Sequence, residues 1–520
     1  MRMTPFDAPG DFHPTAEGGE LRRLAVRGGA ATISGAGLSL AIQVVSTVIL
    51  ARLLTPADFG LVAMVTTFAL LLMSVGANGC NEAIIQRDKM DRFLASNLFW
   101  INLAVGLILM IGFAAAGSLL ARFYKNPQVA RIAVVMSPTI LIAGISVVHV
   151  GLLKRAMRFA TVSANEVVGR AANTVVAIVL TLRGWGYWAL VVGIVVQSLS
   201  IAMGAWWLCR WIPSRPRRGM GTRGILKFAA SVYGTFNANY FTRNFDNLLV
   251  GWRFNSVALG YYKKAYDLFA LSASQLTVPL NNVALAALSR VKDDPPRFRR
   301  HLASSLAIIA FIGMALGGDL TLVGKDVVRL VLGPKWLESG RIFELFGPGV
   351  GVMLVYGTVG WIHLSIGKPG RLLRWTLVES AATASLFILA LRWGPAGIAV
   401  AWSVSFWILL IPAFWYAGRP IQFGTSQLMA AVWKYGVASL TAGWVTTITV
   451  RRFGFLATPA GAGAALEGII VISVVFLTLY LTAVILLHRG FSPLRQFGIL
   501  LLELAPVSRT SDLQEVLKES

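Results

Sequence analysis

Cysteine and charge are scarce in this sequence. Charged residues make up 13% of its 520 residues, against about 25% in an ordinary soluble domain, and 56% of the residues are hydrophobic. Two cysteines, Cys80 and Cys209, are too few for a disulfide framework or a zinc site. A Gly-x-x-x-x-Gly-Lys-Ser/Thr phosphate loop is also missing, so we expect no ATPase of this type in the chain. We predict no metal site and no cofactor.

Apolar runs of membrane length recur along the whole chain. A run of about 20 apolar residues crosses a hydrocarbon core of about 30 Å as a helix. The sequence therefore predicts an all-α polytopic membrane protein with about fourteen transmembrane helices. The predicted spans are 28–53, 59–78, 94–120, 128–151, 160–182, 187–209, 225–252, 258–281, 301–323, 342–366, 372–392, 395–416, 427–450 and 463–488.

Basic residues are distributed unevenly between the predicted loops. With the N-terminus in the cytoplasm, and with basic residues in the outermost four positions of a span counted with the adjoining loop, the inner segments hold 29 of the 47 Lys and Arg residues and the outer loops hold 13. This positive-inside bias places both termini in the cytoplasm and explains much of the net charge of +24. We therefore predict contact with anionic membrane lipids and no nucleic-acid partner. The outer loops are too short for a soluble catalytic domain.

Two pairs of outward loops share an outline and indicate an internal repeat. The segment 52–61 matches 252–261, with the N-cap types Thr55 and Asn255 at equivalent places, and 182–189 matches 391–398. A repeat of two times six spans predicts two lobes in parallel orientation, as in multidrug-exporter-like transporters. The predicted parts are a cytoplasmic segment 1–27, an N-lobe 28–209, a basic cytoplasmic linker 210–224, a C-lobe 225–416, two further helices 426–488 and a cytoplasmic tail 489–520.

Polar residues line one face of the seventh span. Asn237, Tyr240, Asn244 and Asn247 follow a helical spacing, and Arg243 and Asp246 lie beside them. Charge inside hydrocarbon is costly and commonly functional. An arginine fork suits a diphosphate, so this face predicts a headgroup site; the alternative is a set of structural ion pairs. The eighth span adds two further candidate ligands, Lys263 and Lys264.

The fifth and eleventh spans contain the other charged candidates. Arg170 is a second candidate headgroup ligand, and it lies four residues after Glu166, with which it could form a structural pair. Glu379 is either a coupling carboxylate or the mark of a misplaced span. Asp246, Glu166 and Glu379 are the predicted ion-coupling residues. Among the weaker polar signals, we expect Asn97 and Asn102 to bond between helices, and His149 and His363 to lie at the interface.

Four segments together resemble a known family. Arg-Leu-Leu-Thr-Pro-Ala-Asp-Phe-Gly-Leu at 52–61, and the segments 239–251, 258–266 and 288–299, are similar to the polysaccharide transporter family. These are the Wzx-like lipopolysaccharide and exopolysaccharide flippases of the multidrug/oligosaccharidyl-lipid/polysaccharide (MOP) exporter superfamily. In one departure, Asn281 and the residues after it stand where relatives tend to have Phe-Pro.

The resemblance implies a function and a location. It implies export of an undecaprenyl-diphosphate-linked oligosaccharide, the repeat unit of an O-antigen or exopolysaccharide, across the bacterial inner membrane by alternating access. A polysaccharide polymerase or chain-length regulator is a possible partner. Among the candidate residues, only the Arg243–Asn247 cluster matches the family pattern. A cation-coupled multidrug exporter and a non-catalytic component of a polymerase complex stay open as alternatives, since neither needs a catalytic loop.

Overall fold

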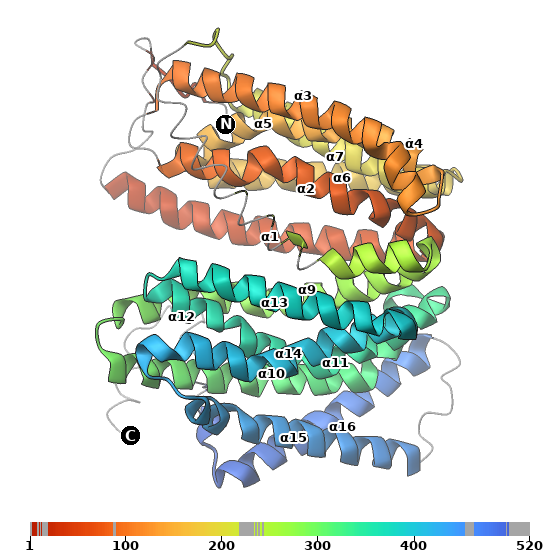
Figure 1. The fold of residues 1–520 in the computed structure, drawn as a ribbon, viewed down its shortest axis with the longest axis vertical. Helices are drawn as coiled ribbons and strands as arrows, with labels where there is room; N and C mark the ends of the chain where they lie inside the picture. The colour runs from red at the N-terminus through yellow and green to blue at the C-terminus, as the bar shows by residue number, and fades with distance from the viewer. Residues whose placement is uncertain are drawn as a thin grey trace. The chain divides into compact units, whose positions relative to one another are not determined.

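The computed structural model describes residues 3–7, 10, 12, 19–86, 90–217, 233, 237, 240–241, 244–452, 462–495 and 497–498. Long helices dominate these residues (Figure 1). The helices are α1 (Gly19–Leu53), α2 (Pro56–Gln86), α3 (Arg92–Phe123), α4 (Gln128–Met136), α5 (Pro138–Arg155), α6 (Phe159–Leu182), α7 (Tyr187–Leu208), α9 (Ser256–Arg290), α10 (Pro295–Leu332), α11 (Leu337–Gly357), α12 (Val359–Ser365), α13 (Pro369–Ala390), α14 (Gly394–Gly418), α15 (Thr425–Arg452) and α16 (Ala462–His488). Residues 244–253 are also helical.

The predicted all-α polytopic fold is confirmed. Among the described residues, ten segments are long and apolar enough to cross a membrane. One of them, Pro369–Ile421, contains both α13 and α14. The chain is therefore a multi-pass membrane protein, and the total of fourteen helices stays a prediction.

Two predicted spans are each divided into two helices. The span 128–151 breaks into α4 and α5 at Pro138, which has no N–H to donate to the preceding turn. The span 342–366 breaks into α11 and α12 at Thr358. There the Thr358 hydroxyl donates to the Val355 carbonyl at 2.8 Å, a local bond that competes with the helix.

Two other helices are longer than the sequence indicated. The second predicted span ends at residue 78, but α2 continues to Gln86. The span 301–323 lies inside α10, which has 38 residues and is about 57 Å long at 1.5 Å per residue. Both helices are therefore long enough to extend beyond the hydrocarbon core.

The chain forms two compact units. The first unit comprises Met1–Lys264 with Val331–Glu338 and Thr383–Ile398, and the second comprises Ala265–Leu330, Ser339–Ala382 and Ala399–Ser520. In the first unit α1 packs on α6, α6 on α7, and α5 on both α2 and α3. The first turns of α9 thus group with the N-terminal helices, and the predicted division into lobes remains a prediction.

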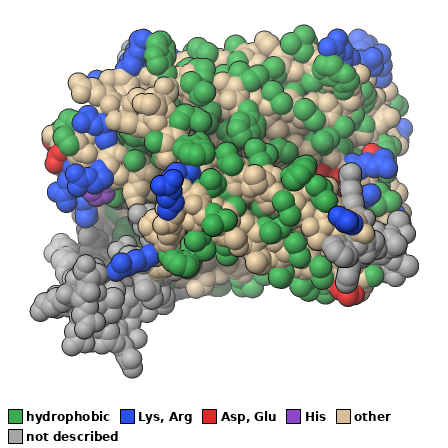
Figure 2. Space-filling view, turned by 90° about the horizontal axis from the view of Figure 1, so that it is seen from below, with side chains coloured by type: hydrophobic (Ala, Val, Ile, Leu, Met, Phe, Trp, Pro, Cys, Tyr) green, Lys and Arg blue, Asp and Glu red, His purple; other side chains and the backbone are tan. Residues whose placement is uncertain are grey.

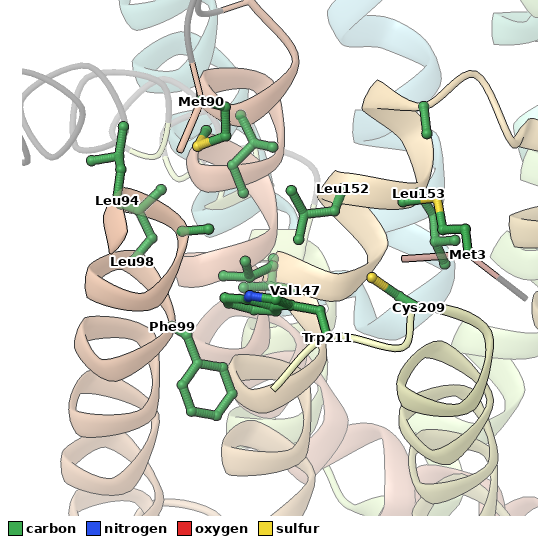
Figure 3. Packing of buried hydrophobic residues seen from close by; sticks show 14 of the residues in the cluster. Met3, Met90, Leu94, Leu98, Phe99, Val147, Leu152, Leu153, Cys209 and Trp211 are labelled. Carbon is green, nitrogen blue, oxygen red and sulfur yellow. The ribbon is translucent and has the colours of Figure 1, made fainter. Parts of the chain in front are cut away.

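A hydrophobic cluster closes one end of the first unit. It joins the start of α3, the second half of α5 and the segment that follows α7 (Figure 3). Leu98, Leu152 and Cys209 are completely buried there, and Trp211 is 5% exposed. Met3, near the N-terminus, packs into the same cluster. All of these helix ends are predicted to be cytoplasmic.

In the second unit, α15 and α16 are fastened to α10. The Ser439 hydroxyl of α15 donates to the Met314 carbonyl at 2.7 Å, and the Tyr480 hydroxyl of α16 donates to the Phe311 carbonyl at 2.7 Å. On the face that Figure 2 shows, most Lys and Arg side chains gather toward two opposite sides, and hydrophobic side chains cover much of the band between them. This distribution is typical of a membrane-embedded surface.

Candidate functional site

The two repeat-related helices α2 and α9 cross at a pair of glycines in the first unit. A Cβ added to Gly60 would collide with the Ser256 carbonyl, and a Cβ added to Gly260 would collide with the Pro56 carbonyl. The two contacts are reciprocal, because Pro56 and Gly60 correspond to Ser256 and Gly260 in the sequence repeat. Only glycine lets the two backbones approach this closely. We call this contact the Gly60–Gly260 crossing.

Equivalent N-caps start both helices at the crossing. The Asp58 carboxylate accepts the Thr55 backbone N–H at 2.9 Å, while the Thr55 hydroxyl accepts the Asp58 N–H at 3.4 Å. In α9 the Asn255 side chain accepts the Ala258 N–H at 2.8 Å. These bonds satisfy N–H groups that a helix leaves open at its first turn. The capping roles predicted for Thr55 and Asn255 are confirmed.

A buried tryptophan fastens the end of α1 beside the crossing. Trp336 is completely buried, and its indole N–H donates to the Ala51 carbonyl at 2.8 Å. The Lys335 ammonium lies 3.5 Å from the Arg52 carbonyl. Both carbonyls belong to the last turn of α1, where the helix has no N–H groups of its own to donate to them. The segment 334–336 therefore caps the C-terminus of α1.

Aromatic rings surround Trp336, and one of them contacts Lys264, a predicted substrate ligand. Phe59 meets Trp336 edge to face at 5.5 Å between ring centroids, and Tyr261 does so at 6.1 Å. The Lys264 ammonium lies 4.0 Å from the centroid of the Phe59 ring. This is a cation–π contact, which satisfies part of the lysine charge inside the protein. The structure thus brings Lys264 to the crossing.

Asp246 is buried at the same end of the unit. It is 1% exposed, and its carboxylate accepts the Tyr262 hydroxyl at 2.8 Å and the Asn247 backbone N–H at 2.7 Å. Lys263 interacts with it electrostatically. A carboxylate this deeply buried needs such donors, because an unpaired charge in the interior is costly. Asp246 therefore ties residues 244–253 to α9.

The polar face of the predicted seventh span lies partly against α2. The Tyr240 hydroxyl donates to the Thr67 carbonyl of α2 at 2.7 Å. Asn237 and Asn244 donate to carbonyls four residues earlier in their own segment, at 3.3 and 3.0 Å. Asn247 is 1% exposed, and within the described chain neither atom of its amide has a hydrogen-bond partner. The predicted ligand Arg243 lies outside the described residues.

Arg170 contacts α1 through a neutral side chain. Its guanidinium Nη1 donates to Gln43 Oε1 at 2.9 Å, and Glu166 on the same helix is exposed. Among the described residues, no ion pair joins Glu166 to Arg170, so the alternative of a self-neutralised pair is not observed. An amide partner leaves the full positive charge of Arg170 in place.

Glu379 lies in the middle of α13, so it does not mark a misplaced span. It is half-buried and hydrogen-bonded to the Tyr356 hydroxyl of α11. The Trp375 indole N–H donates to that same hydroxyl at 2.7 Å. With the indole donating to its oxygen, the tyrosine can direct its own proton toward the carboxylate of Glu379.

Several polar residues differ from their expectations. His149 and His363 were predicted to lie at the interface, but both are completely buried, His149 against Trp206 at 4.2 Å between ring centroids. Asn102 donates to the Leu98 carbonyl of its own helix at 2.8 Å, and its predicted bond between helices stays a prediction. Both histidines lie near the ends of predicted spans, which indicated an interfacial position. Their burial depends on tertiary packing, which the sequence pattern does not report.

Asp319 is a candidate that the sequence reasoning missed. It lies inside α10 after two glycines and is hydrogen-bonded to Ser473 of α16. Its Oδ1 is buried and has no hydrogen-bond partner among the described residues. An acidic residue within an apolar run was the signal that could have identified it.

A cavity of about 390 Å³ opens in the second unit between α10, α11, α14 and α15. No charged residue occurs among the described residues that line it. The hydroxyls of Thr321, Ser439 and Thr447 in its wall all donate to backbone carbonyls. Its chemistry suits a hydrocarbon chain and not a diphosphate or a sugar.

The fold defines the general class of protein. The structure of the lipid II flippase MurJ in an inward closed conformation matches 88% of this chain and 98% of its own, with a TM-score of 0.69 and 15% identity. An inward-facing multidrug resistance MATE family transporter of the MOP superfamily matches 74% of this chain and 94% of its own, with a TM-score of 0.56 and 15% identity. The chain therefore has the fold of the MOP-superfamily transporters.

The family follows from the sequence. Residues 49–341 match the model of the polysaccharide biosynthesis protein family, and the chain belongs to that family. The succinoglycan biosynthesis transport protein ExoT of Rhizobium meliloti (strain 1021) is 22% identical over 342 residues, 66% of this chain and 69% of ExoT. The teichuronic acid biosynthesis protein TuaB of Bacillus subtilis (strain 168) is 24% identical over 346 residues, 64% of this chain and 71% of TuaB. The resemblance inferred from the motifs is confirmed.

Proposed function

We propose that this chain is a flippase that moves an undecaprenyl-diphosphate-linked oligosaccharide across the bacterial inner membrane. The observation that carries the proposal is the family match over residues 49–341, which contains the whole polar region of the predicted seventh and eighth spans. The names of the relatives refer to different polysaccharides, succinoglycan and teichuronic acid. The proposal therefore specifies the class of substrate, a lipid-linked glycan, and not its sugars.

The headgroup of the lipid is the reason why its transfer across a membrane requires a protein. A diphosphate with attached sugars loses its hydration in hydrocarbon, and each unpaired charge or hydroxyl there is costly. A polar path through the bundle replaces water while the prenyl chain stays among apolar groups. No covalent step is required, so we propose a transporter that rocks two lobes in alternating access and has no catalytic centre.

The contacts in the structure distinguish between the proposed ligands of the headgroup. Arg170 is half-buried and bonded to the neutral Gln43, and its charge is therefore suited to a phosphate oxygen. Arg243 keeps its proposed role from the sequence pattern. Lys264 already interacts with the Phe59 ring, so we propose that it meets substrate only when the Gly60–Gly260 crossing opens. Further proposed contacts are Asn237, Tyr240, Asn244, Asn247 and Lys263.

We propose a gradient-driven secondary transporter with a carboxylate as its coupling group. Glu379 is favoured, because the Trp375–Tyr356 pair directs a proton donor at it inside α13. Asp246 and Glu166 are the other two candidates. We also propose that both termini are cytoplasmic and that a polymerase or chain-length regulator receives the product outside.

The test is a measurement of the lipid-linked oligosaccharide pool in a strain that lacks this gene and has no second flippase for the same glycan. We expect repeat units to accumulate on the cytoplasmic side, and wild-type protein to cure the accumulation. Arg243→Ala and Arg170→Ala should fail to cure it at equal protein level. An unchanged pool together with unchanged surface polysaccharide would contradict the proposal and favour a drug exporter.

A further inference from the structure

The cavity between α10, α11, α14 and α15 has a buried floor and an exposed rim. Met314, Gly347 and Gly351 line the floor and are buried. Trp444 of α15 and Trp407 of α14 line the rim, and they are 69% and 46% exposed. The helices α10, α11 and α14 all belong to segments that are long and apolar enough to cross a membrane. The cavity therefore opens on the surface of the second unit at membrane depth.

Small residues of α15 leave this space open. Gly436, Ser439, Gly443 and Thr447 follow one another at helical spacing and share one face of α15. A Cβ added to Gly436 or Gly443 would meet nothing within 4 Å. The Ser439 and Thr447 hydroxyls donate to backbone carbonyls, so neither proton is left for a polar ligand. This face therefore offers a ligand mainly apolar contact.

The size of the cavity fits one hydrocarbon chain. An apolar cavity of about 150 Å³ binds benzene, which has six carbons. At the same packing, a cavity of about 390 Å³ has room for about sixteen carbons. This is the size of one acyl chain of an ordinary membrane phospholipid, whereas an undecaprenyl chain is several times longer.

The helices α10 and α15 run in the same direction along the cavity. Tyr435 meets Phe311 at 5.9 Å between ring centroids, and one turn later the Ser439 hydroxyl donates to the Met314 carbonyl. The last residues that line the cavity on these two helices therefore lie at the same end. In the predicted topology this is the outer end, because the ninth and thirteenth spans both run outward.

Charged side chains of both signs lie at this end. Lys325 of α10 and Arg452 of α15 follow within one turn of the last lining residues of their helices, and both are exposed. The Glu344 carboxylate of α11 accepts the Lys325 backbone N–H at 3.2 Å and also interacts with Asp326 and Arg341. Such a mixture suits a zwitterionic headgroup, because its phosphate is attracted to the cations and its ammonium to the carboxylates.

We propose that this cavity is a binding site for one acyl chain of a zwitterionic phospholipid, such as phosphatidylethanolamine, whose headgroup lies at the charged outer end. The chain packs where α15 has no large side chains and so joins α15 to α10 and α11. The site is separate from the polar face proposed for the glycan headgroup. The inference does not depend on the proposed function, because any bilayer supplies this ligand.

Photocrosslinking to the purified full-length protein tests the proposal. The labelled lipid is a phosphatidylethanolamine with a diazirine midway along one acyl chain, and peptide mass spectrometry locates its adducts. Lipid that only coats the surface reaches exposed side chains, whereas adducts on the buried Met314 or Gly351 require a chain inside the cavity. Gly443→Leu and Gly436→Leu each fill part of the cavity from α15. Gly112→Leu in α3 is the matched control, because it adds the same side chain at an exposed glycine that faces open space.

We expect adducts on the floor of the wild-type cavity, reduced about fivefold or more by either leucine in α15 and unchanged by Gly112→Leu. Excess unlabelled phosphatidylethanolamine should compete these adducts away, and undecaprenyl phosphate should not. Size-exclusion chromatography verifies that the variants are folded, and either α15 variant is sufficient for the test.

Three results would overturn the proposal: no floor adducts in the wild type, floor adducts that unlabelled phospholipid does not reduce, or full labelling in a folded α15 variant. Competition by undecaprenyl phosphate at the same concentration would overturn it as well, because the cavity would then accept the prenyl chain of the proposed substrate.

Discussion

The two ends of the first unit are held together by opposite means. At the Gly60–Gly260 crossing two backbones touch because neither residue has a side chain. At the other end, Asn97 and Trp100 reach out to the backbone of residues 214–217. The glycine contact exists only because both residues lack a Cβ, so any larger side chain would disrupt it. Hydrogen bonds of about 0.5–1.5 kcal/mol each can instead break and form again. The crossing is therefore suited to an all-or-none contact. The contact between α3 and residues 214–217 is suited to gradual adjustment.

Removal of Trp336 should break the crossing end most severely. Trp336→Ala deletes a completely buried ring and the cap of α1, which should cost about 3–5 kcal/mol of stability. Thermal unfolding in detergent measures the loss. Trp393→Ala is the control, since that ring is 60% exposed, and it should cost little. Equal losses in both variants would show that Trp336 does not support the crossing.

A single methyl group should separate the backbones at the crossing. Gly60→Ala or Gly260→Ala places a Cβ against a carbonyl oxygen, and overpacking typically costs about 1–3 kcal/mol. If that cost falls on the crossed state alone, its population falls by about 5–150-fold. Restoration of surface polysaccharide in the deletion strain should drop accordingly. Gly112→Ala in α3, where a Cβ meets nothing within 4 Å, should restore fully; full restoration by Gly60→Ala would refute the crossing.

A buried hydroxyl sharpens the role of Asp246. Tyr262→Phe removes the donor to its carboxylate, which should cost about 1–3 kcal/mol in thermal unfolding. Asp246→Asn tests the partner, and a double-mutant cycle isolates the pair. The double variant should cost less than the sum of the single ones. Strict additivity would mean that the two side chains do not interact in the folded protein.

The last prediction concerns the reactivity of Cys209 at the other end of the first unit and needs no change in stability. Burial raises the pKa of its thiol to about 12, and alkylation requires the thiolate. In a Cys80→Ser background at pH 8, maleimide should therefore react with Cys209 far more slowly than with a free thiol of pKa about 8.5. Fast labelling of the folded protein would show that the chain after α7 is not packed against α3. Labelling after denaturation provides the control.

Local features of the fold could be read from the sequence, whereas tertiary partners could not. Two helix starts could be predicted from Thr55, Pro56 and Asn255, because capping depends only on residues that are neighbours in the sequence. The repeat related Gly60 to Gly260, but nothing in it states that the two helices touch. Likewise the pattern around Asn97 shows a polar residue in an apolar helix and cannot specify residue 217 as its partner.

The candidate site was predictable to a similar degree. The helical spacing of the seventh span predicted one face for Tyr240, Asn244 and Asn247, but the sequence pattern could not identify the Thr67 carbonyl of α2 as the acceptor of the Tyr240 hydroxyl. Arg170 was identified from its charge alone, and its partner Gln43 lies 127 residues away. Burial of His149 depends on Trp206 and Trp211, which meet it only in three dimensions.

Direct measurement of lipid movement tests the central claim most simply. Purified protein is placed in vesicles that carry a polyprenyl-diphosphate-linked oligosaccharide in one leaflet, and an impermeant reagent that modifies the glycan reports its arrival in the other. The account predicts transfer well above that of protein-free vesicles, and less transfer with Gly60→Ala than with Gly112→Ala. Transfer equal to that of protein-free vesicles, with folded protein present and an ion gradient imposed in either direction, would contradict it.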